Sequence, residues 1–315
     1  MNKHITQEDL IKAQSREKPR QEVVAQAREE SIQVNLPNEQ QDKYAHIVAR
    51  VYDMLVSLRR ERPMVHMIPN DVSATLCADA IAATGARPIM AIAKEEVMDI
   101  VAQSGSLVIN AGQLTTIKQE SMRQAVKGAI SHKKQVVFDP VGAGASLFRL
   151  QYAKEIEAMD WEGIIKLNTS EYKALISQEL TYTGVDGMGK VEHAKANTLG
   201  KRAVCITGAI DHIWTGEKWI GIGHEATRLP QIVGSGCLLG ALCGAFLTVT
   251  DKPYEAGVAA SLLCAVASIE AEAQAVGYGD YKVKLIDALS TITHESLHKY
   301  GIALLEKGEE YGTNI

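Results

Sequence analysis

The sequence predicts an α/β protein with a mostly parallel central sheet and helices on both of its faces. Beyond residue 60, short apolar runs alternate with stretches of helical length. Strands and helices that alternate in this way form parallel sheets, because each helix carries the chain back across one face. A polar or glycine-rich turn follows each of five predicted strands, and parallel sheets bind ligands where their strands end. We therefore expect one catalytic domain over 61–315.

The composition indicates an ordinary globular protein. The chain has 315 residues, of which 46% are hydrophobic and 23% charged. This length suffices for one large domain with an extension. The net charge of -5 excludes nucleic acid as the main partner, because nucleic-acid binding needs a basic surface.

The cysteines and the N-terminus indicate a cytoplasmic protein. The five cysteines form no C-x-x-C pair, so we expect free thiols in a reducing compartment. The N-terminal stretch is too polar for a signal peptide. No apolar stretch is expected to be long and uninterrupted enough to span a bilayer, so we expect no membrane contact.

The residue pattern of 1–60 predicts an N-terminal helical extension that is partly flexible. The first 36 residues are polar and charged, without a sustained apolar face. From about 38 to 60 apolar residues recur at helical spacing, namely Tyr44, Ile47, Val48, Val51, Met54, Leu55 and Leu58. This amphipathic helix packs either on its own domain or on another subunit.

The remaining elements follow in order along the chain. The predicted strands are 63–68, 88–91, 106–110, 135–139, 163–166 and 203–207, and the predicted helices are 71–84, 95–103 and 115–131, with one more before residue 163. The first of these helices ends at Gly85, as helices commonly do at glycine. The segment 211–224 suits a hairpin around Gly216, and 237–275 suits packed helices.

Five strand-end turns are expected to share one edge of the sheet. They are 69–71, 110–112, 139–144, 168–171 and 207–208. His66, on the first strand, is expected to be a buried structural histidine rather than a catalyst.

The turn Gly234-Ser235-Gly236-Cys237 is the first candidate for chemistry. Glycines let a backbone approach a ligand closely, and the N–H groups at the start of the following predicted helix, 238–249, favour anions such as phosphate. Cys237 falls in the first turn of that helix, where a thiol pKa should drop below its usual value of about 8.5. The alternative interpretation is a tight helix entry with a buried cysteine.

Two acidic segments are candidates for a metal or phosphate site. Asn168 and Glu171 follow a strand and can hold a Mg²⁺-water cluster beside phosphates. They can equally form a helix N-cap with Glu171 in the first turn, and the two interpretations are compatible. Asp139 precedes a glycine turn, which suits either a metal or phosphate contact or simple turn chemistry.

One apparent nucleotide motif is rejected. Residues 184–190 have the glycine and lysine spacing of a P-loop, but Val191 follows where a serine or threonine hydroxyl is needed. No apolar strand precedes the segment either. A P-loop NTPase is therefore excluded.

Read together and in order, these motifs resemble the hydroxyethylthiazole kinase family of thiamine biosynthesis, which has a ribokinase-like three-layer fold. The resemblance covers about 61–295. It rests on PMVHMIPNDV, ATGARPIMAIAKEEV, LVINAGQL, VVFDPVGAGASLFR, NTSE, GVDG, CITGAID and VGSGCLLGALCGAF. It implies ATP- and Mg²⁺-dependent phosphorylation of the hydroxyethyl group of 4-methyl-5-(2-hydroxyethyl)thiazole, by a homotrimer with substrate sites at its subunit interfaces.

The resemblance also implies a role for each matching residue. The thiazole is assigned to Met90, Gly112 and Gly234, with Asn70 beside them, and phosphoryl transfer to Gly234, Gly236 and Cys237. The nucleotide is assigned to Lys166, Asn168, Thr207 and Gly184, and Mg²⁺ to Asp139 and Glu171.

Some positions depart from the family pattern and leave two other hypotheses open. Lys166-Leu167 stands where the family usually has Arg-Gly, and Pro69 stands where threonine is usual. The first hypothesis is a kinase for a related hydroxyalkyl heterocycle. The second is a thiazole- or thiamine-binding regulatory protein on a catalytically decayed scaffold.

Overall fold

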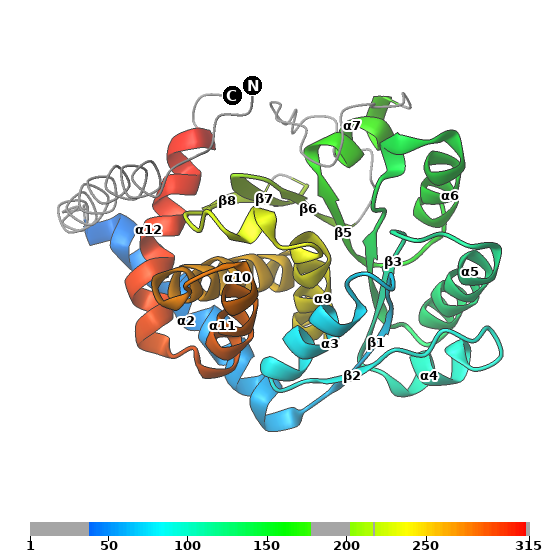
Figure 1. Ribbon diagram of the computed structural model, residues 1–315, viewed down its shortest axis with the longest axis horizontal. Helices are drawn as coiled ribbons and strands as arrows, with labels where there is room; N and C mark the ends of the chain where they lie inside the picture. The colour runs from blue at the N-terminus through cyan, green and yellow to red at the C-terminus, as the bar shows by residue number, and fades with distance from the viewer. Residues whose placement is uncertain (1–37, 178–201, 217, 313–315) are drawn as a thin grey trace, which may run out of the picture. The chain divides into compact units, whose positions relative to one another are not determined.

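A computed structural model describes residues 38–177, 202–216 and 218–312 of the chain (Figure 1). Residues Tyr44–Ile315 form one compact unit. The predicted flexible segment 1–36 and the rejected P-loop segment 184–190, with Gly184, lie outside the described residues.

Within the described residues the sheet has eight strands in the order β2-β1-β3-β4-β5-β6-β7-β8. The first six pair in parallel, and β7 and β8 continue the sheet in antiparallel pairing. The strands are β1 Met64–Ile68, β2 Arg87–Ile89, β3 Ser106–Asn110, β4 Gln135–Asp139, β5 Gly163–Asn168, β6 Ala203–Thr207, β7 Ile210–Thr215 and β8 Lys218–Gly223. All six predicted strands and the predicted hairpin are therefore confirmed.

Helices cover both faces of this sheet (Figure 1). One face carries α2 (Asn38–Glu61) from Tyr44 onward, with α3 Ala74–Ala83, α9 Ser235–Leu247, α10 Pro253–Gln274, α11 Tyr278–Thr291 and α12 His294–Gly312. The other face carries α4 Val97–Gln103, α5 Thr116–Ser131, α6 Leu147–Glu157 and α7 Thr169–Ser177. This is the three-layer arrangement that the sequence predicts.

Alternate side chains of each strand enter two separate apolar cores. On β5, Ile164 belongs to the core beneath α9 and α10, whereas Ile165 and Leu167 belong to the core beneath α5 and α6. This two-residue alternation is the geometry of a strand. Lys166 keeps the same alternation, so its charged side chain points toward α9.

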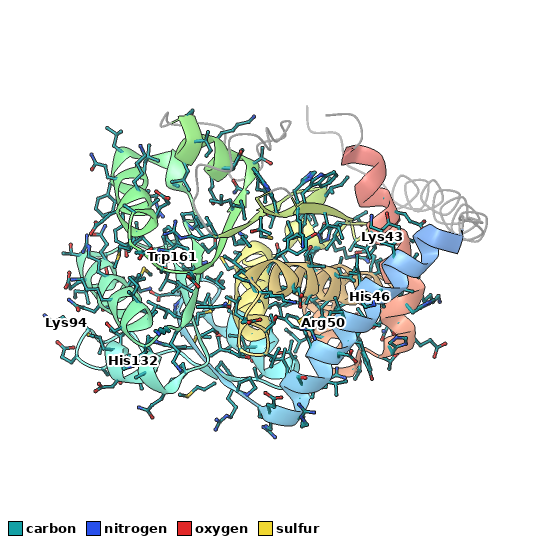
Figure 2. All side chains as sticks on the ribbon, turned by 180° about the vertical axis from the view of Figure 1, so that it is seen from behind. Lys43, His46, Arg50, Lys94, His132 and Trp161 are labelled. Carbon is teal, nitrogen blue, oxygen red and sulfur yellow. The ribbon has the colours of Figure 1, made fainter. Side chains whose placement is uncertain are left out.

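Helix α2 packs on its own domain, as one of the two interpretations expected. Its buried side chains Tyr44, Val48, Val51, Met54, Leu55 and Leu58 belong to the core beneath α9 and α10. His46 and Arg50 lie on its exposed side (Figure 2), and Arg50 pairs with Glu255 of α10 at 2.9 Å. The predicted boundary after residue 60 therefore cuts off a helix that belongs to the core of the compact unit.

By length and composition alone, helix α10 is long and apolar enough to cross a membrane. No such stretch was expected from the sequence. However, 78% of its most apolar window is buried inside the protein. It packs on α9, α11 and strands β5 to β8. This burial identifies it as a core helix.

Three glycines bring α9 unusually close to the sheet. A Cβ atom on Gly244 would lie 2.1 Å from Cγ2 of Val108 on β3, and one on Gly240 would lie 3.6 Å from Oδ2 of Asp139 on β4. A Cβ atom on Gly236 would lie 3.1 Å from Nζ of Lys166 on β5. The three positions recur every four residues, so they form one face of the helix.

We predict that Gly244→Ala lowers the free energy of unfolding by about 1–3 kcal/mol, because the added methyl overpacks the core against Val108. Chemical denaturation measures this loss. Gly279→Ala is the matched control, since it adds the same methyl to α11 where no atom lies within 4 Å. Adding Val108→Ala to Gly244→Ala should recover part of the loss. Equal losses in the two glycine variants would contradict this account.

Candidate active site

The five predicted strand-end turns do share one edge of the sheet. Strands β1, β3, β4, β5 and β6 are adjacent and parallel. Their register places Asn110 beside Asp139 and Asn168 beside Thr207. The N-terminus of α9 meets this edge, since Gly236 of its first turn lies against Lys166. Parallel pairing thus brings together residues that are far apart in the sequence.

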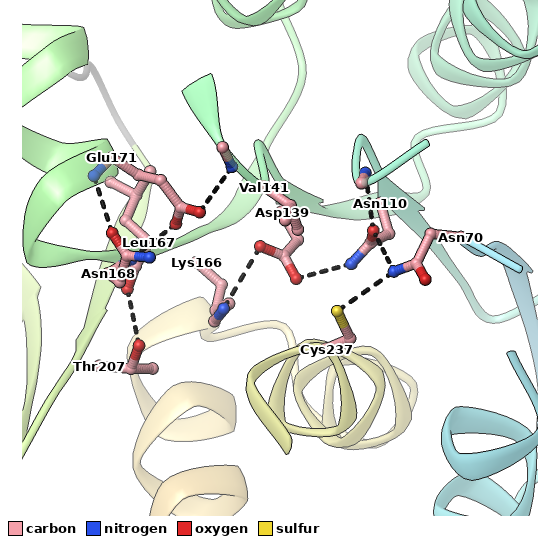
Figure 3. Close-up of polar contacts among 12 residues, drawn as sticks. Asn70, Asn110, Asp139, Val141, Lys166, Leu167, Asn168, Glu171, Thr207 and Cys237 are labelled. Carbon is pink, nitrogen blue, oxygen red and sulfur yellow. Dashed lines mark hydrogen bonds and ion pairs between the residues drawn. The ribbon is translucent and has the colours of Figure 1, made fainter. Parts of the chain in front are cut away.

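A continuous row of hydrogen bonds joins four strands to Cys237 (Figure 3). The Lys166 ammonium donates to Oδ1 of Asp139 at 3.3 Å, and Nδ2 of Asn110 donates to Oδ2 of the same carboxylate at 2.8 Å. Nδ2 of Asn70 lies 2.8 Å from Oδ1 of Asn110 and 3.3 Å from Sγ of Cys237, and is a donor to both. The position of the thiol is therefore tied to the Lys166–Asp139 ion pair.

The glycine turn adopts a backbone that only glycine accepts easily. Gly234 caps α9 with φ of +91°, in the left-handed region. A Cβ atom there would lie 2.7 Å from Cβ of Ser73. The amides of a helix's first turn have no intrahelical acceptors, so the first turn of α9 presents donors and a positive dipole end to the strand ends. The helix begins at Ser235 rather than at the predicted Leu238, and Cys237 lies in its first turn as expected.

Burial controls the charges at the centre of the site. Asp139 is fully buried and Lys166 is nearly so. Burial raises the pKa of Asp139 to about 7, although the Lys166 ammonium opposes this rise. Burial lowers the pKa of Lys166, but the Asp139 and Glu171 carboxylates more than offset this, so the net pKa is raised and the ammonium keeps its proton. A permanent positive charge therefore sits beside the first turn of α9.

The predicted fall in the Cys237 pKa was wrong. Desolvation raises the pKa of this thiol, and the neighbouring Asp139 carboxylate raises it further, against the opposing charge of Lys166. Hydrogen bonds with Ser73 and Asn110 also lower the pKa, but the net shift is upward. The side chain is buried, so it is a neutral thiol near neutral pH.

The Asn168–Glu171 segment forms the N-cap that one interpretation expected. The Glu171 amide donates to Oδ1 of Asn168, and the Asn168 amide donates to Oε2 of Glu171, both at 2.8 Å. This reciprocal pair is a capping box. Oε1 of Glu171 accepts the Gly142 amide at 2.8 Å, and the Thr207 hydroxyl donates to the Leu167 carbonyl at 3.2 Å. The segment thus joins the ends of β4, β5 and β6.

The two acidic residues assigned to Mg²⁺ fit a hydrated ion better than a protein-held one. Each carboxylate oxygen of Asp139 and Glu171 already accepts a hydrogen bond. Among the described residues no group of three or more histidine, cysteine, aspartate or glutamate side chains has the arrangement to hold a metal ion. Magnesium commonly keeps several waters and binds through one or two carboxylates and phosphates. The residues therefore suit an ion that arrives with phosphates.

The remaining assigned residues lie at the same edge. Gly112 donates its amide to Oδ1 of Asn110 at 3.0 Å. Met90 follows β2, next to Ala91, whose carbonyl lies 2.9 Å from Nε2 of His66. Burial lowers the pKa of His66, so the histidine is neutral near neutral pH, and its Nδ1 has no hydrogen-bond partner among the described residues. Met90 is partly buried and packs against the core beneath α9 and α10.

Sequence reasoning missed two residues that organise this edge. Asn110 contacts Asn70, Gly112 and Asp139 with its single amide group. Arg149 donates to the carbonyls of Ala111 and Gly112 after β3 and of Val141 after β4. The polar end of an otherwise apolar strand was a signal for Asn110. Nothing local marks Arg149, since its partners are backbone atoms.

Fold and site together define an α/β protein of the ribokinase-like class. The fold is similar to that of a pyridoxal kinase from Bacillus subtilis, with a TM-score of 0.52 at 20% identity over 65% of this chain and 90% of that chain. That likeness is one of fold alone.

The chain belongs to the hydroxyethylthiazole kinase family, whose sequence profile matches residues 55–295. It is 35% identical to a hydroxyethylthiazole kinase of Vibrio parahaemolyticus (serotype O3:K6, strain RIMD 2210633) over 256 residues, which cover 80% of this chain and 96% of that protein. A structure of a hydroxyethylthiazole kinase protein from Pyrococcus horikoshii OT3 matches with a TM-score of 0.70 at 31% identity, over 78% of this chain and 95% of that one. The resemblance seen in the sequence is therefore confirmed, and the protein is a kinase.

We predict that the Cys237 thiol stays protonated below pH 8. Its environment raises the pKa above the ordinary value of about 8.5. The thiolate absorbance near 240 nm of the wild-type protein, minus that of Cys237→Ala, should show no ionisation in this range. A step below pH 7 would contradict the raised pKa and restore the thiolate expected at a helix N-terminus.

Proposed function

We propose that this protein transfers the γ-phosphoryl group of ATP to the primary alcohol of 4-methyl-5-(2-hydroxyethyl)thiazole. The observation that carries this proposal is the Lys166 ammonium, held between Asp139 and the first turn of α9. A buried cation and outward-pointing amides aimed at one place suit a transferring phosphoryl group. Membership of the hydroxyethylthiazole kinase family supports the alcohol as acceptor.

In this proposal the glycine turn and Lys166 supply most of the stabilisation of the transition state. The alcohol oxygen forms a bond to the γ-phosphorus while the bond between the γ-phosphorus and the bridging β-phosphate oxygen breaks. ADP leaves with that oxygen, and the hydroxyl proton passes to water. Such a transition state is loose and depends mainly on positioning and on charge neutralisation. The amides of Gly234 and Gly236 and the Lys166 ammonium stabilise the charge on the transferring group. Cys237 is a neutral thiol that accepts a hydrogen bond from Asn70. In this proposal it lies beside the alcohol and forms part of the wall of the alcohol's binding site.

The substrate and the nucleotide lie on opposite sides of this centre in our proposal. Met90, Gly112, Asn70 and Gly234 contact the thiazole alcohol, and Asn168, Thr207 and Gly184 seat the nucleotide. In this proposal Lys166, which was assigned to the nucleotide, contacts its γ-phosphoryl group. Bound Mg²⁺ would neutralise phosphate charge, with Asp139 and Glu171 holding it through its own waters.

The assembly and location are parts of the same proposal. Four large apolar side chains near the strand ends, Val72, Ile117, Leu147 and Phe148, are more than half exposed. Such exposure supports a homotrimer in which a neighbouring subunit covers them. All five cysteines are free and buried, which supports a reducing cytoplasm.

The purified protein is tested with Mg·ATP and the thiazole alcohol. We expect ADP and the thiazole phosphate to form in equal amounts. Preferred turnover of another hydroxyalkyl heterocycle would overturn the substrate assignment. Binding of the thiazole without turnover at saturating Mg·ATP would instead favour the regulatory protein on a decayed scaffold.

A variant of the glycine turn tests the assigned centre. Gly236→Ala places a methyl 3.1 Å from the Lys166 ammonium and displaces it. We expect kcat to fall about tenfold or more, with a smaller change in KM for either substrate. Gly279→Ala, which meets no atom within 4 Å, is the control and should leave kcat unchanged. An active Gly236→Ala enzyme would remove Lys166 from the phosphoryl-transfer step.

A further inference from the structure

A buried polar cluster lies directly behind the nucleotide end of the site. Asp211, the second residue of β7, is only 2% exposed. Its Oδ2 accepts the Ser261 hydroxyl of α10 at 2.6 Å and lies 2.9 Å from Nε2 of His224, which follows β8. Its Oδ1 accepts the amide of Gly208 at 3.2 Å. Three elements thus converge on one carboxylate in a largely apolar core.

The cluster holds the turn that carries Thr207. Gly208 follows Thr207 directly, and Asp211 anchors its amide from within the adjoining strand. His224 also donates its backbone amide to the Ala209 carbonyl at 3.0 Å. The turn between β6 and β7 is therefore fixed on both sides by the two members of one ion pair.

The contact between Asp211 and His224 favours the charged form of each. Burial works to raise the pKa of Asp211, but His224, Ser261 and the Gly208 amide together lower it. Burial works to lower the pKa of His224, and Asp211 raises it overall, against the small opposing effect of Lys307 on α12. The other groups that face Asp211 are the thiols of Cys205 on β6 and Cys264 on α10, whose raised pKa values keep them neutral.

A buried ion pair is a poor way to gain stability, because desolvation offsets most of its attraction. Its contribution here is geometric, since it gives the Gly208 amide a charged acceptor that cannot rotate. We propose that Asp211, held by His224 and Ser261, is a positioning residue for nucleotide binding that fixes the Thr207–Gly208 turn in its binding conformation. This inference rests on the proposed function, in which Thr207 seats the nucleotide.

The test compares the two substrates. Asp211→Ala leaves the Gly208 amide without its acceptor, and a lost bond to a charged group is worth about tenfold or more in affinity. We expect KM for ATP, and the calorimetric Kd for ADP measured without alcohol, to rise about tenfold. KM for the alcohol should change less than twofold. A folded Asp211→Ala enzyme with unchanged ADP affinity, or with equal rises in both KM values, overturns the proposal.

The conservative variant separates position from charge. Asp211→Asn keeps one oxygen for the Gly208 amide, so it should recover most of the ADP affinity lost in Asp211→Ala. If Asp211→Ala does not fold, His224→Gln gives the answer through the same ratio of KM values, because it removes one of the two side chains that hold Asp211. Wild-type ADP affinity in His224→Gln overturns the proposal.

A second ion pair, at the end of β6 that lies away from the Thr207–Gly208 turn, is the matched control. Arg202, just before β6 at its opposite end, pairs with Glu157 at 3.3 Å. Glu157→Gln should lower stability and leave ADP affinity unchanged. A similar loss of ADP affinity in Glu157→Gln would reduce the Asp211 effect to general destabilisation.

The positioning role of Asp211 can be tested separately from the proposed function. If the wild-type protein binds no ADP, the proposed function fails, while hydrogen exchange at the Gly208 amide still reports on the turn. Exchange that is slow in the wild type and fast in Asp211→Ala supports the positioning role. Equal exchange rates overturn it.

The charge on His224 can be tested through the pH dependence of the free energy of unfolding. The His224 pKa is raised in the folded protein, so its contribution to stability is complete below its ordinary value of about 6.5 and is lost as the pH rises through the raised value. The difference in unfolding free energy between wild type and His224→Gln should therefore be largest near pH 6 and shrink at higher pH. A difference that grows with pH would show that His224 is neutral when folded.

Discussion

The close packing of α9 on the sheet is the constraint on which the rest of this molecule depends. Gly236, Gly240 and Gly244 leave no side chain between the helix and strands β5, β4 and β3. A side chain at Gly244 would clash with Val108, and one at Gly236 would press on the Lys166 ammonium. The close approach brings the positive end of the helix, its first-turn amides and Cys237 to the same edge as five polar turns.

The same packing makes the charges at that edge interdependent. Lys166 is buried beneath α9 and needs a partner, because an isolated buried cation is costly. Asp139 supplies it and is itself held by Asn110. The result is a fixed positive charge whose counter-charge has a pKa of about 7. Burial and the Asp139 carboxylate raise the pKa of Cys237 against the charge of Lys166, so Cys237 stays neutral.

The sequence was sufficient to predict the helices and strands, but not the side-chain contacts between them. Apolar runs of strand length and the polar turns after them predicted every strand and the edge at which Asn70, Gly112, Asp139 and Thr207 meet. The direction of the Cys237 pKa depended on Asp139, which lies about one hundred residues earlier and is brought close only by the fold. Arg149 and Asp211 act on backbone atoms, and backbone partners leave no trace in a residue pattern.

The two halves of the site are held by different kinds of contact, and this difference explains why their residues were not equally visible. Side chains from four strand ends hold one another around Cys237, so each carries a polar signal at a strand terminus (Figure 3). On the side that we propose for the nucleotide, the turns are held by carboxylates that accept backbone amides, Glu171 from Gly142 and Asn168, and Asp211 from Gly208. A carboxylate used in this way fixes a loop while leaving its outward groups free for a ligand. Backbone-anchored turns suit a nucleotide, whose phosphates are recognised largely by amides and charge.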